Sequence, residues 1–250
     1  MPERKADFIK KWSLFLNVIC LLFLVSWVFP AQAEEGGKSG PGSLDHLIGL
    51  AEKDDVDAQL RLAGIYFQGR GVVKDYKEAA RWYRKAADLG SALGQTALGV
   101  FYLDGIGMKQ DYGEALKWLE KAAAQEEVTA EYNLGNMYMQ GRGVAADDAK
   151  AMIMFRKASE KGHAWSQFNL AGGYYEGRGV PKDLAEAAKW CRKAAENGDV
   201  QAQYKLGLMY SKGEGVPEDK NETKKWLRKA ASQGYAPAES SLAELGEKLK

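Results

Sequence analysis

The sequence predicts an all-α protein, an α-solenoid built from helix–turn–helix repeats of 36 residues. A leucine, a tyrosine and a pair of glycines recur at that spacing without a single insertion. They are Leu62, Leu98, Leu134, Leu170 and Leu206; Tyr66, Tyr102, Tyr138, Tyr174 and Tyr210; and Gly69/Gly71, Gly105/Gly107, Gly141/Gly143, Gly177/Gly179 and Gly213/Gly215. A fixed period of this kind is typical of repeat architectures, in which each unit stacks on the next.

The first 33 residues predict an export segment. A basic start is followed by an apolar run, residues 12–29, and then by Ala31-Gln32-Ala33, a small-residue motif typical of a signal-peptide cleavage site. The run is also just long enough to cross a bilayer as an uncleaved N-terminal anchor. In both interpretations the remainder of the chain is exported.

Residues 34–43 predict a flexible linker, because they are rich in glycine and serine. A degenerate helix at 44–57 then opens the array as an N-terminal cap. Five complete repeats follow at 58–93, 94–129, 130–165, 166–201 and 202–237, and a half-repeat at 238–250 closes the array. Because one helical hairpin cannot bury both of its faces, a row of stacked hairpins is the expected solution.

Each repeat predicts a first helix, a tight loop and a second helix. In the first repeat Ala58, Leu62 and Tyr66 are spaced four residues apart, so they form one buried stripe of the first helix. The residue after the leucine is small in every repeat, which allows a neighbouring helix to approach closely. These residues are Ala63, Gly99, Gly135, Ala171 and Gly207. The second helix carries a tryptophan on its apolar face, except in the third repeat, where Met154 replaces it.

The loop carries a Gly-x-Gly motif and then an aspartate. Glycine at both positions permits the positive φ angles that a sharp reversal requires. The aspartate predicts an N-cap for the second helix, and a glutamate three residues later predicts a capping box in four repeats. The aspartates are Asp75, Asp111, Asp147, Asp183 and Asp219, of which only Asp147 lacks the glutamate and is followed by Lys150.

Together these residues resemble the Sel-1-like repeat, a relative of the tetratricopeptide repeat. Segments 130–138 and 202–210 are close matches to its first helix, and the resemblance extends over residues 58–250. It implies a right-handed superhelical scaffold that binds other proteins. Exported bacterial members are implicated in envelope signalling, polysaccharide secretion and host contact, so the resemblance predicts a fold more specifically than a role.

Composition argues against several kinds of functional site. The chain has 35 basic and 34 acidic residues, so it lacks the basic surplus of a nucleic-acid-binding protein. It has only two histidines and two cysteines, of which Cys191 occupies an apolar position and predicts a buried, unreactive thiol. His163 lies in a turn, and basic pairs such as Arg84-Lys85 predict a solvated rim. We expect no catalytic residue, no cofactor and no metal.

One set of positions predicts a binding surface. Two, six and nine residues after each repeat begins, the first helix carries side chains outside the leucine–tyrosine stripe, and a tetratricopeptide-like stack places them on its concave face. They vary between repeats and are mostly apolar or aromatic, as in a peptide-binding groove. The predicted groove residues are Phe67, Val100, Leu103, Tyr132, Asn136, Met139, Phe168, Tyr175, Tyr204 and Leu208. The alternative is that several of them only pack between consecutive repeats.

The sequence therefore predicts a non-enzymatic scaffold in the bacterial periplasm that binds a partner protein or peptide in this groove. For its location, an inner-membrane anchor facing the periplasm and full secretion are the alternatives. For its function, the alternatives are an enzyme of the β-lactam or cell-wall hydrolase type, and a polysaccharide-binding component of an envelope secretion or signalling system. A cysteine-rich branch of the family is linked to β-lactam binding, but its paired cysteines are missing here. We expect no nucleic-acid partner, and membrane association only if the export segment stays uncleaved.

Overall fold

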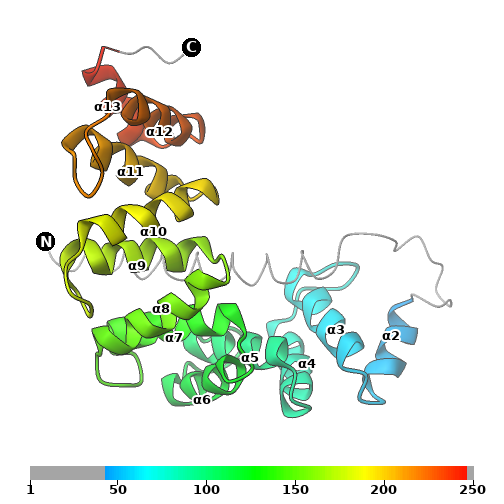
Figure 1. Ribbon diagram of the computed structural model, residues 1–250. Coiled ribbons are helices and arrows are strands. Elements are labelled where there is room, and N and C mark those ends of the chain that lie inside the picture. Colours follow the sequence, from blue (N-terminus) through cyan, green and yellow to red (C-terminus); the bar gives the residue numbers. More distant parts are fainter. Residues whose placement is uncertain (1–42, 247–250) are drawn as a thin grey trace, which may run out of the picture. The chain divides into compact units, whose positions relative to one another are not determined.

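A computed structural model describes residues 43–246, and this part of the chain contains twelve α-helices and no strand (Figure 1). The predicted all-α class is therefore confirmed. The predicted export segment, most of the linker and the last residues of the closing half-repeat lie outside the described residues. The helices are α2 (Leu44–Ala51), α3 (Val56–Gln68), α4 (Tyr76–Asp88), α5 (Ala92–Asp104), α6 (Tyr112–Ala123), α7 (Val128–Gln140), α8 (Asp148–Glu160), α9 (Ala164–Glu176), α10 (Leu184–Glu196), α11 (Val200–Lys212), α12 (Lys220–Ser232) and α13 (Ala236–Glu244).

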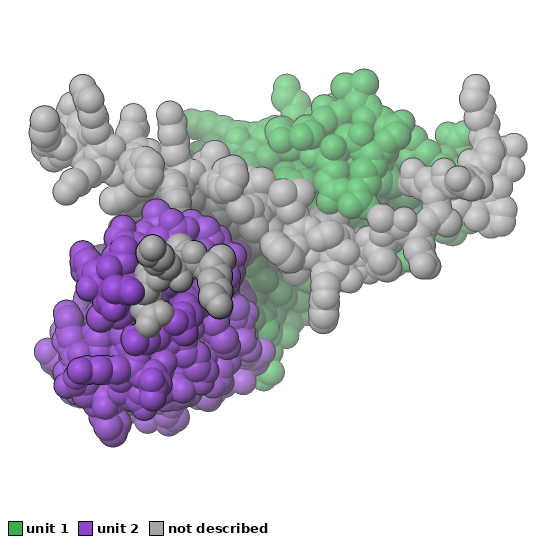
Figure 2. Space-filling model, turned by 90° about the horizontal axis from the view of Figure 1, so that it is seen from above, with its two compact units in different colours: residues 1–133 green, residues 134–250 purple. Residues whose placement is uncertain are grey.

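The described chain divides into two compact units, residues 43–133 and residues 134–246, which Figure 2 shows in green and purple. The boundary falls inside α7. Within each unit a helix packs chiefly on the next helix of the chain, from α2 through α6 and from α8 through α13. Packing between sequential neighbours is what a solenoid predicts, because each repeat buries its apolar face against the following one.

The predicted element boundaries need one correction at the start of the array. Residues 44–57 are not a single opening helix, because α2 ends at Ala51 and α3 begins at Val56. Asp54 breaks the helix with a positive φ of 64°, and the Asp55 side chain then caps α3 by accepting from the Ala58 N–H at 2.8 Å. The first helix of each repeat therefore starts a few residues before the repeat boundary that the sequence predicts.

The Gly-x-Gly loops end the first helices as predicted. Gly69, for example, is a left-handed C-cap with φ 74°, and Gly71 also has a positive φ, of 68°. The second glycine has a further role that the sequence does not reveal, because it touches the preceding repeat. A Cβ atom added at Gly107 would lie 2.5 Å from the Tyr76 carbonyl group, at the start of the preceding repeat's second helix. This glycine thus sets the distance between neighbouring repeats.

The repeated aspartates cap the second helices as predicted, but the predicted capping box is wrong. The Asp111 side chain accepts from the N–H groups of Gly113 and Glu114, at 2.9 and 3.0 Å. The Asp111 N–H itself already donates to the Tyr102 carbonyl oxygen, at 3.0 Å, so it needs no glutamate partner. Glu114 instead accepts a hydrogen bond from the Trp118 indole N–H at 3.0 Å.

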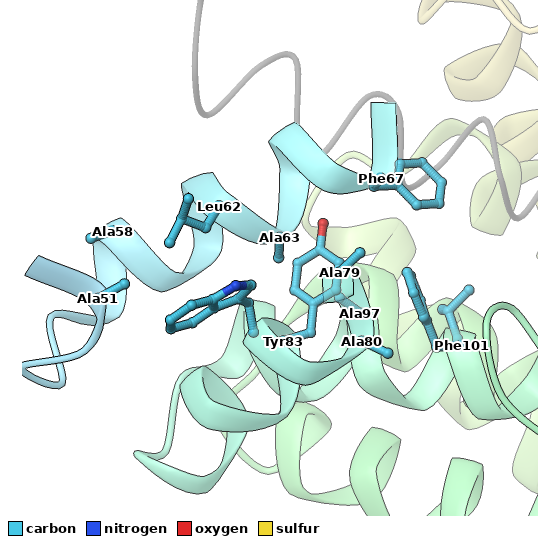
Figure 3. Packing of buried hydrophobic residues seen from close by; sticks show 12 residues of the cluster. Ala51, Ala58, Leu62, Ala63, Phe67, Ala79, Ala80, Tyr83, Ala97 and Phe101 are labelled. Carbon is cyan, nitrogen blue, oxygen red and sulfur yellow. The ribbon is translucent and has the colours of Figure 1, made fainter. Parts of the chain in front are cut away.

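Close contacts between helices occur where the sequence predicts them. A Cβ atom at Gly99 would lie 2.7 Å from the Leu119 side chain, and one at Gly135 would lie 2.6 Å from the Phe155 ring. Figure 3 shows the corresponding packing of α3, α4 and α5, where Tyr83 meets Phe101 edge-on with the ring centroids 5.3 Å apart. The absent side chains therefore allow the facing helix to insert a large apolar group.

The predicted solvated rim is wrong for three arginines of the second helices, whereas Arg228 is exposed as predicted. The guanidinium groups of Arg84, Arg156 and Arg192 lie over tyrosine rings of the next repeat, 5.4–5.6 Å from the ring centroids. Each also donates a hydrogen bond to the same tyrosine's hydroxyl group. The tyrosines are Tyr102, Tyr174 and Tyr210. Cation–π attraction and hydrogen bonding thus couple each of these arginines to the repeat that follows.

Candidate functional site

The predicted groove residues do not all reach the surface. Phe67, Val100, Leu103 and Tyr132 are buried, with exposed fractions of 4%, 1%, 2% and 7%. Phe67 packs on the rings of Tyr76 and Phe101, at centroid distances of 5.4 and 5.7 Å, and belongs with Val100 to the core of α3 to α5. The groove prediction is therefore wrong for these four residues. A side chain with so little exposed surface offers little to a partner.

The remaining six predicted residues are partly exposed, and three of them line a pocket in the second unit. The pocket has a volume of about 350 Å³ and includes Met139, Phe168 and Tyr175. Its other lining residues are Met152, Asn169, Ala171, Gly172, Gly173, Glu176, Arg178, Ala187, Cys191, Lys205 and Met209. Most of the wall is apolar, and the polar groups are few, as in sites that bind one or two side chains of a ligand.

The first helices of consecutive repeats supply the predicted part of this wall. Met139 comes from the end of α7, and Phe168 and Tyr175 lie two turns apart on α9. The next first helix, α11, contributes Lys205 and Met209. The space beside α9 is widened by Gly172, since a Cβ atom added there would have no neighbour within 4 Å.

Charged side chains contact two of the pocket-lining residues, Tyr175 and Arg178. The Lys205 ammonium lies 3.5 Å from the centroid of the Tyr175 ring. The Tyr175 hydroxyl donates to Glu214 at 2.8 Å, and this hydrogen bond raises the pKa of Tyr175. Arg178 is held by Asp148, with an N···O distance of 2.9 Å. Because Lys205 covers one face of the Tyr175 ring, the pocket offers a ligand the Phe168 ring and the Lys205 cation, whereas Arg178 already has a carboxylate partner.

Sequence reasoning missed Lys205 and Met209. It considered three positions of each first helix, and these two residues lie three and seven positions after their repeat begins. Three predicted residues, Asn136, Tyr204 and Leu208, do not line the pocket. The Tyr204 ring instead packs on Tyr235 near the end of the array, with centroids 5.3 Å apart.

Cys191 and His163 carry side chains that could act in catalysis, but both have structural roles in this protein. Burial raises the pKa of the Cys191 thiol to about 12, and its Sγ atom donates to the Ala202 carbonyl oxygen at 3.3 Å. The predicted buried thiol is thus confirmed. His163 caps α9 by accepting from the Ser166 N–H at 3.3 Å, and burial lowers its pKa to about 4. Within residues 43–246 no cluster of His, Cys, Asp and Glu side chains could hold a metal ion.

None of the helices in residues 43–246 combines the length and the apolar character that crossing a membrane requires. The predicted signal peptide or anchor at 1–33 falls outside this range.

Two solved structures are similar to this chain over 81% of its length. One is c5321, a protective antigen present in uropathogenic Escherichia coli strains and displaying an SLR fold, with 36% identity and a TM-score of 0.77. The other is a Sel1 repeat protein from Oxalobacter formigenes, with 36% identity and a TM-score of 0.76. The aligned region covers only 44% and 59% of these two chains.

A third structure, the immunity protein Pa5087 from Pseudomonas aeruginosa, shares only the fold. It is 20% identical over 78% of this chain and 74% of its own, with a TM-score of 0.52. A search of curated proteins found no match.

A model of the Sel1 repeat matches five segments of the chain, and each match falls on one pair of helices. The matched segments are 56–91, 92–126, 128–163, 166–199 and 200–235. All five segments start close to the N-terminus of a first helix. Four of them start two residues before the repeat boundary that the 36-residue period predicts, and the segment 166–199 starts at that boundary. Five consecutive matches across most of the chain, on helix pairs of the expected order, show that this protein belongs to the Sel1 repeat family.

Proposed function

We propose that this protein is a non-enzymatic scaffold of the bacterial periplasm, which binds a partner protein or peptide through the pocket of Met139, Phe168, Tyr175, Lys205 and Met209. Sel1 repeats generally serve as protein-interaction scaffolds. The observation that carries the proposal is the pocket itself, since apolar and aromatic side chains enclose a volume suited to an anchoring side chain. Location in the periplasm rests on the export segment that residues 1–33 predict.

The pocket favours a peptide with a bulky apolar residue. Phe168 and Met139 offer partly exposed apolar contacts, and Lys205 would attract a carboxylate beside the anchoring residue. We therefore expect a short acidic and apolar segment of the partner to dock here. A polysaccharide would use the Tyr175 ring instead, and a glycan array probed with the purified protein tests that alternative.

The test of the pocket is substitution of Phe168 by Ala. Truncating an anchoring aromatic residue should weaken partner binding by about 2 kcal/mol or more. Partners are first identified by cross-linking in periplasmic extracts and mass spectrometry, and their affinity for purified variants is then measured by calorimetry. Tyr204→Ala is the control, because its ring packs on Tyr235 outside the pocket. Full affinity in a folded Phe168→Ala protein would place the recognition surface elsewhere.

The alternative enzymatic function has a direct assay. Hydrolysis of nitrocefin or peptidoglycan by the purified protein would contradict the scaffold proposal. We expect neither, since the Cys191 thiol is protonated and buried and His163 is engaged as a helix cap.

A further inference from the structure

One position of the first helices carries a large side chain in four of the five repeats. It lies seven residues after the repeat begins, and its occupants are Ile65, Phe101, Met137, Gly173 and Met209. Phe101, Met137 and Met209 are at most 1% exposed. A side chain at this position is therefore part of the core, and the fourth repeat lacks it because glycine stands there.

The second repeat shows what surrounds this position when it is filled. The Phe101 ring packs on two rings of the preceding repeat, with its centroid 5.7 Å from that of Phe67 and 5.3 Å from that of Tyr83 (Figure 3). Ala80 belongs to the same core and leaves room for the ring, because its side chain is a single methyl group. Phe67 is consequently only 4% exposed.

In the fourth repeat the same space is only partly filled. Met139 stands where Phe67 stands two repeats earlier, and Met152 stands where Ala80 stands. The Met152 Sδ atom is the nearest neighbour of a Cβ atom added at Gly173, so the thioether reaches into the gap. It does not close the gap, because Met139 is partly exposed and lines the pocket of about 350 Å³ together with Met152 and Gly173. The missing side chain at Gly173 thus helps to create the pocket.

The chemistry of the pocket favours an aromatic ring over an aliphatic side chain. Thioether groups such as those of Met139 and Met152 make favourable contacts with aromatic rings. The partly exposed Phe168 ring belongs to the same wall and can pack on a second ring, as two rings pack on Phe101 in the second repeat. A cavity of roughly 150 Å³ already accommodates benzene, so the pocket has room for a phenyl ring and the atoms that attach it to a peptide.

We infer that the pocket binds the ring of a phenylalanine side chain of the partner, which takes the place that Phe101 takes in the second repeat. This inference rests on the proposed function and names the residue that anchors the partner. Gly173 determines the specificity, since a larger side chain at that position would fill the pocket from within. If Met152 alone compensated for the missing side chain, Met139 would be as buried as Phe67, and it is not.

The experiment uses the full chain with ¹³C in its methionine methyl groups, and the probe is N-acetyl-phenylalanine amide. A bound ring shifts the resonances of nearby methyl groups, so those of Met139 and Met152 should move saturably, with a Kd of about 1–10 mM for so small a ligand. The methyl group of Met137 should not move, because it is buried and does not line the pocket. N-acetyl-leucine amide should bind at least about fivefold more weakly, since it lacks the aromatic contacts.

The variant that tests the gap is Met152→Ala/Gly173→Phe. It gives the fourth repeat the residues that the second repeat uses, Ala80 and Phe101, so it should fold with unchanged circular dichroism. Its own ring should occupy the pocket and abolish the shift of the Met139 resonance. Met152→Ala alone should weaken probe binding by less than about tenfold, because one thioether contact is lost while the gap stays open.

Three results would overturn the phenylalanine anchor: no shift of Met139 and Met152, equal binding of the leucine and phenylalanine probes, or undiminished binding to the filled variant. The probe is measured without any partner, so its failure is separable from failure of the proposed function. A probe that does not bind, beside a Phe168→Ala protein that loses partner affinity, overturns the phenyl ring but not the pocket. A folded Phe168→Ala protein with full partner affinity overturns the proposed function itself.

Discussion

The space around a glycine decides whether a side chain can replace it, and this protein contains both extremes within neighbouring first helices. A Cβ atom at Gly135 would meet the rigid Phe155 ring at 2.6 Å, whereas one at Gly172 would meet nothing within 4 Å. Both glycines lie inside helices, so alanine would improve intrinsic helix stability at either position by about 1 kcal/mol. Packing therefore determines the sign of the net effect.

We expect Gly135→Ala to destabilise the protein by about 1–3 kcal/mol, because the Phe155 ring cannot move aside without disturbing the core. Gly172→Ala should stabilise it by up to about 1 kcal/mol. Urea denaturation followed by circular dichroism measures both changes. Equal effects of the two substitutions would show that α7 and α8 do not approach each other as closely as the structure indicates.

His163 is a helix cap that works only when its ring is neutral. The Nδ1 atom accepts the Ser166 N–H, which a protonated ring cannot do, and burial lowers the pKa of the ring to about 4. In the unfolded chain the ring has the ordinary pKa of about 6.5. Between these two values the unfolded state binds a proton that the folded state excludes, so stability falls as the pH falls.

The expected pH effect is a loss of up to about 3 kcal/mol of folding free energy between pH 6.5 and pH 4. Serine occupies the equivalent cap position in the second repeat, as Ser91, so His163→Ser should preserve the cap without titrating. Denaturant midpoints of the two proteins, compared across this pH range, isolate the histidine from the carboxylates that both share. Parallel pH profiles would contradict the assignment.

Among the helices, a buried glutamine amide links successive repeats through hydrogen bonds that the 36-residue period does not reveal. Gln203 donates to the Ala195 carbonyl oxygen at 3.1 Å and accepts from the Gln233 amide at 2.8 Å. The same bonds recur one repeat earlier, where Gln167 contacts Ser159 and Asn197. Each bridge joins a first helix to second helices before and after it, so it fixes the register of three consecutive elements.

Replacing Gln203 by Leu keeps most of the side-chain volume but leaves the Ala195 carbonyl and the Gln233 amide without this partner. We expect a loss of about 1–3 kcal/mol in the free energy of unfolding. Gln140→Leu is the control, because Gln140 is an exposed residue at the end of α7 and should change stability little. Thermal melts followed by circular dichroism would contradict the bridge if both variants behaved alike.

For the chain as a whole, export is the property that the N-terminal sequence predicts. The basic start, the apolar run at 12–29 and Ala31-Gln32-Ala33 predict cleavage after Ala33. Intact mass spectrometry of protein recovered from the periplasm should therefore find Glu34 at the N-terminus. A full-length chain in the membrane fraction would establish the anchor instead.

The sequence by itself determined the repeat, the order of its helices and the family. These depend on local chemistry that recurs every 36 residues: an aspartate caps a helix, a glycine adopts positive φ, and a small residue follows each leucine. Such features are visible in one repeat because the residues that interact lie close together in the chain.

Only the tertiary structure decided which outward positions remain open to a partner. Val100 and Phe168 belong to the same predicted set, yet Val100 is buried in a core whereas Phe168 lines a pocket. Likewise Arg84 is only partly exposed, because Tyr102 of the next repeat lies within reach of its guanidinium group. The exposure of a side chain on a repeat depends on the residues that neighbouring repeats place against it, and the helical period of a single repeat carries no information about those contacts.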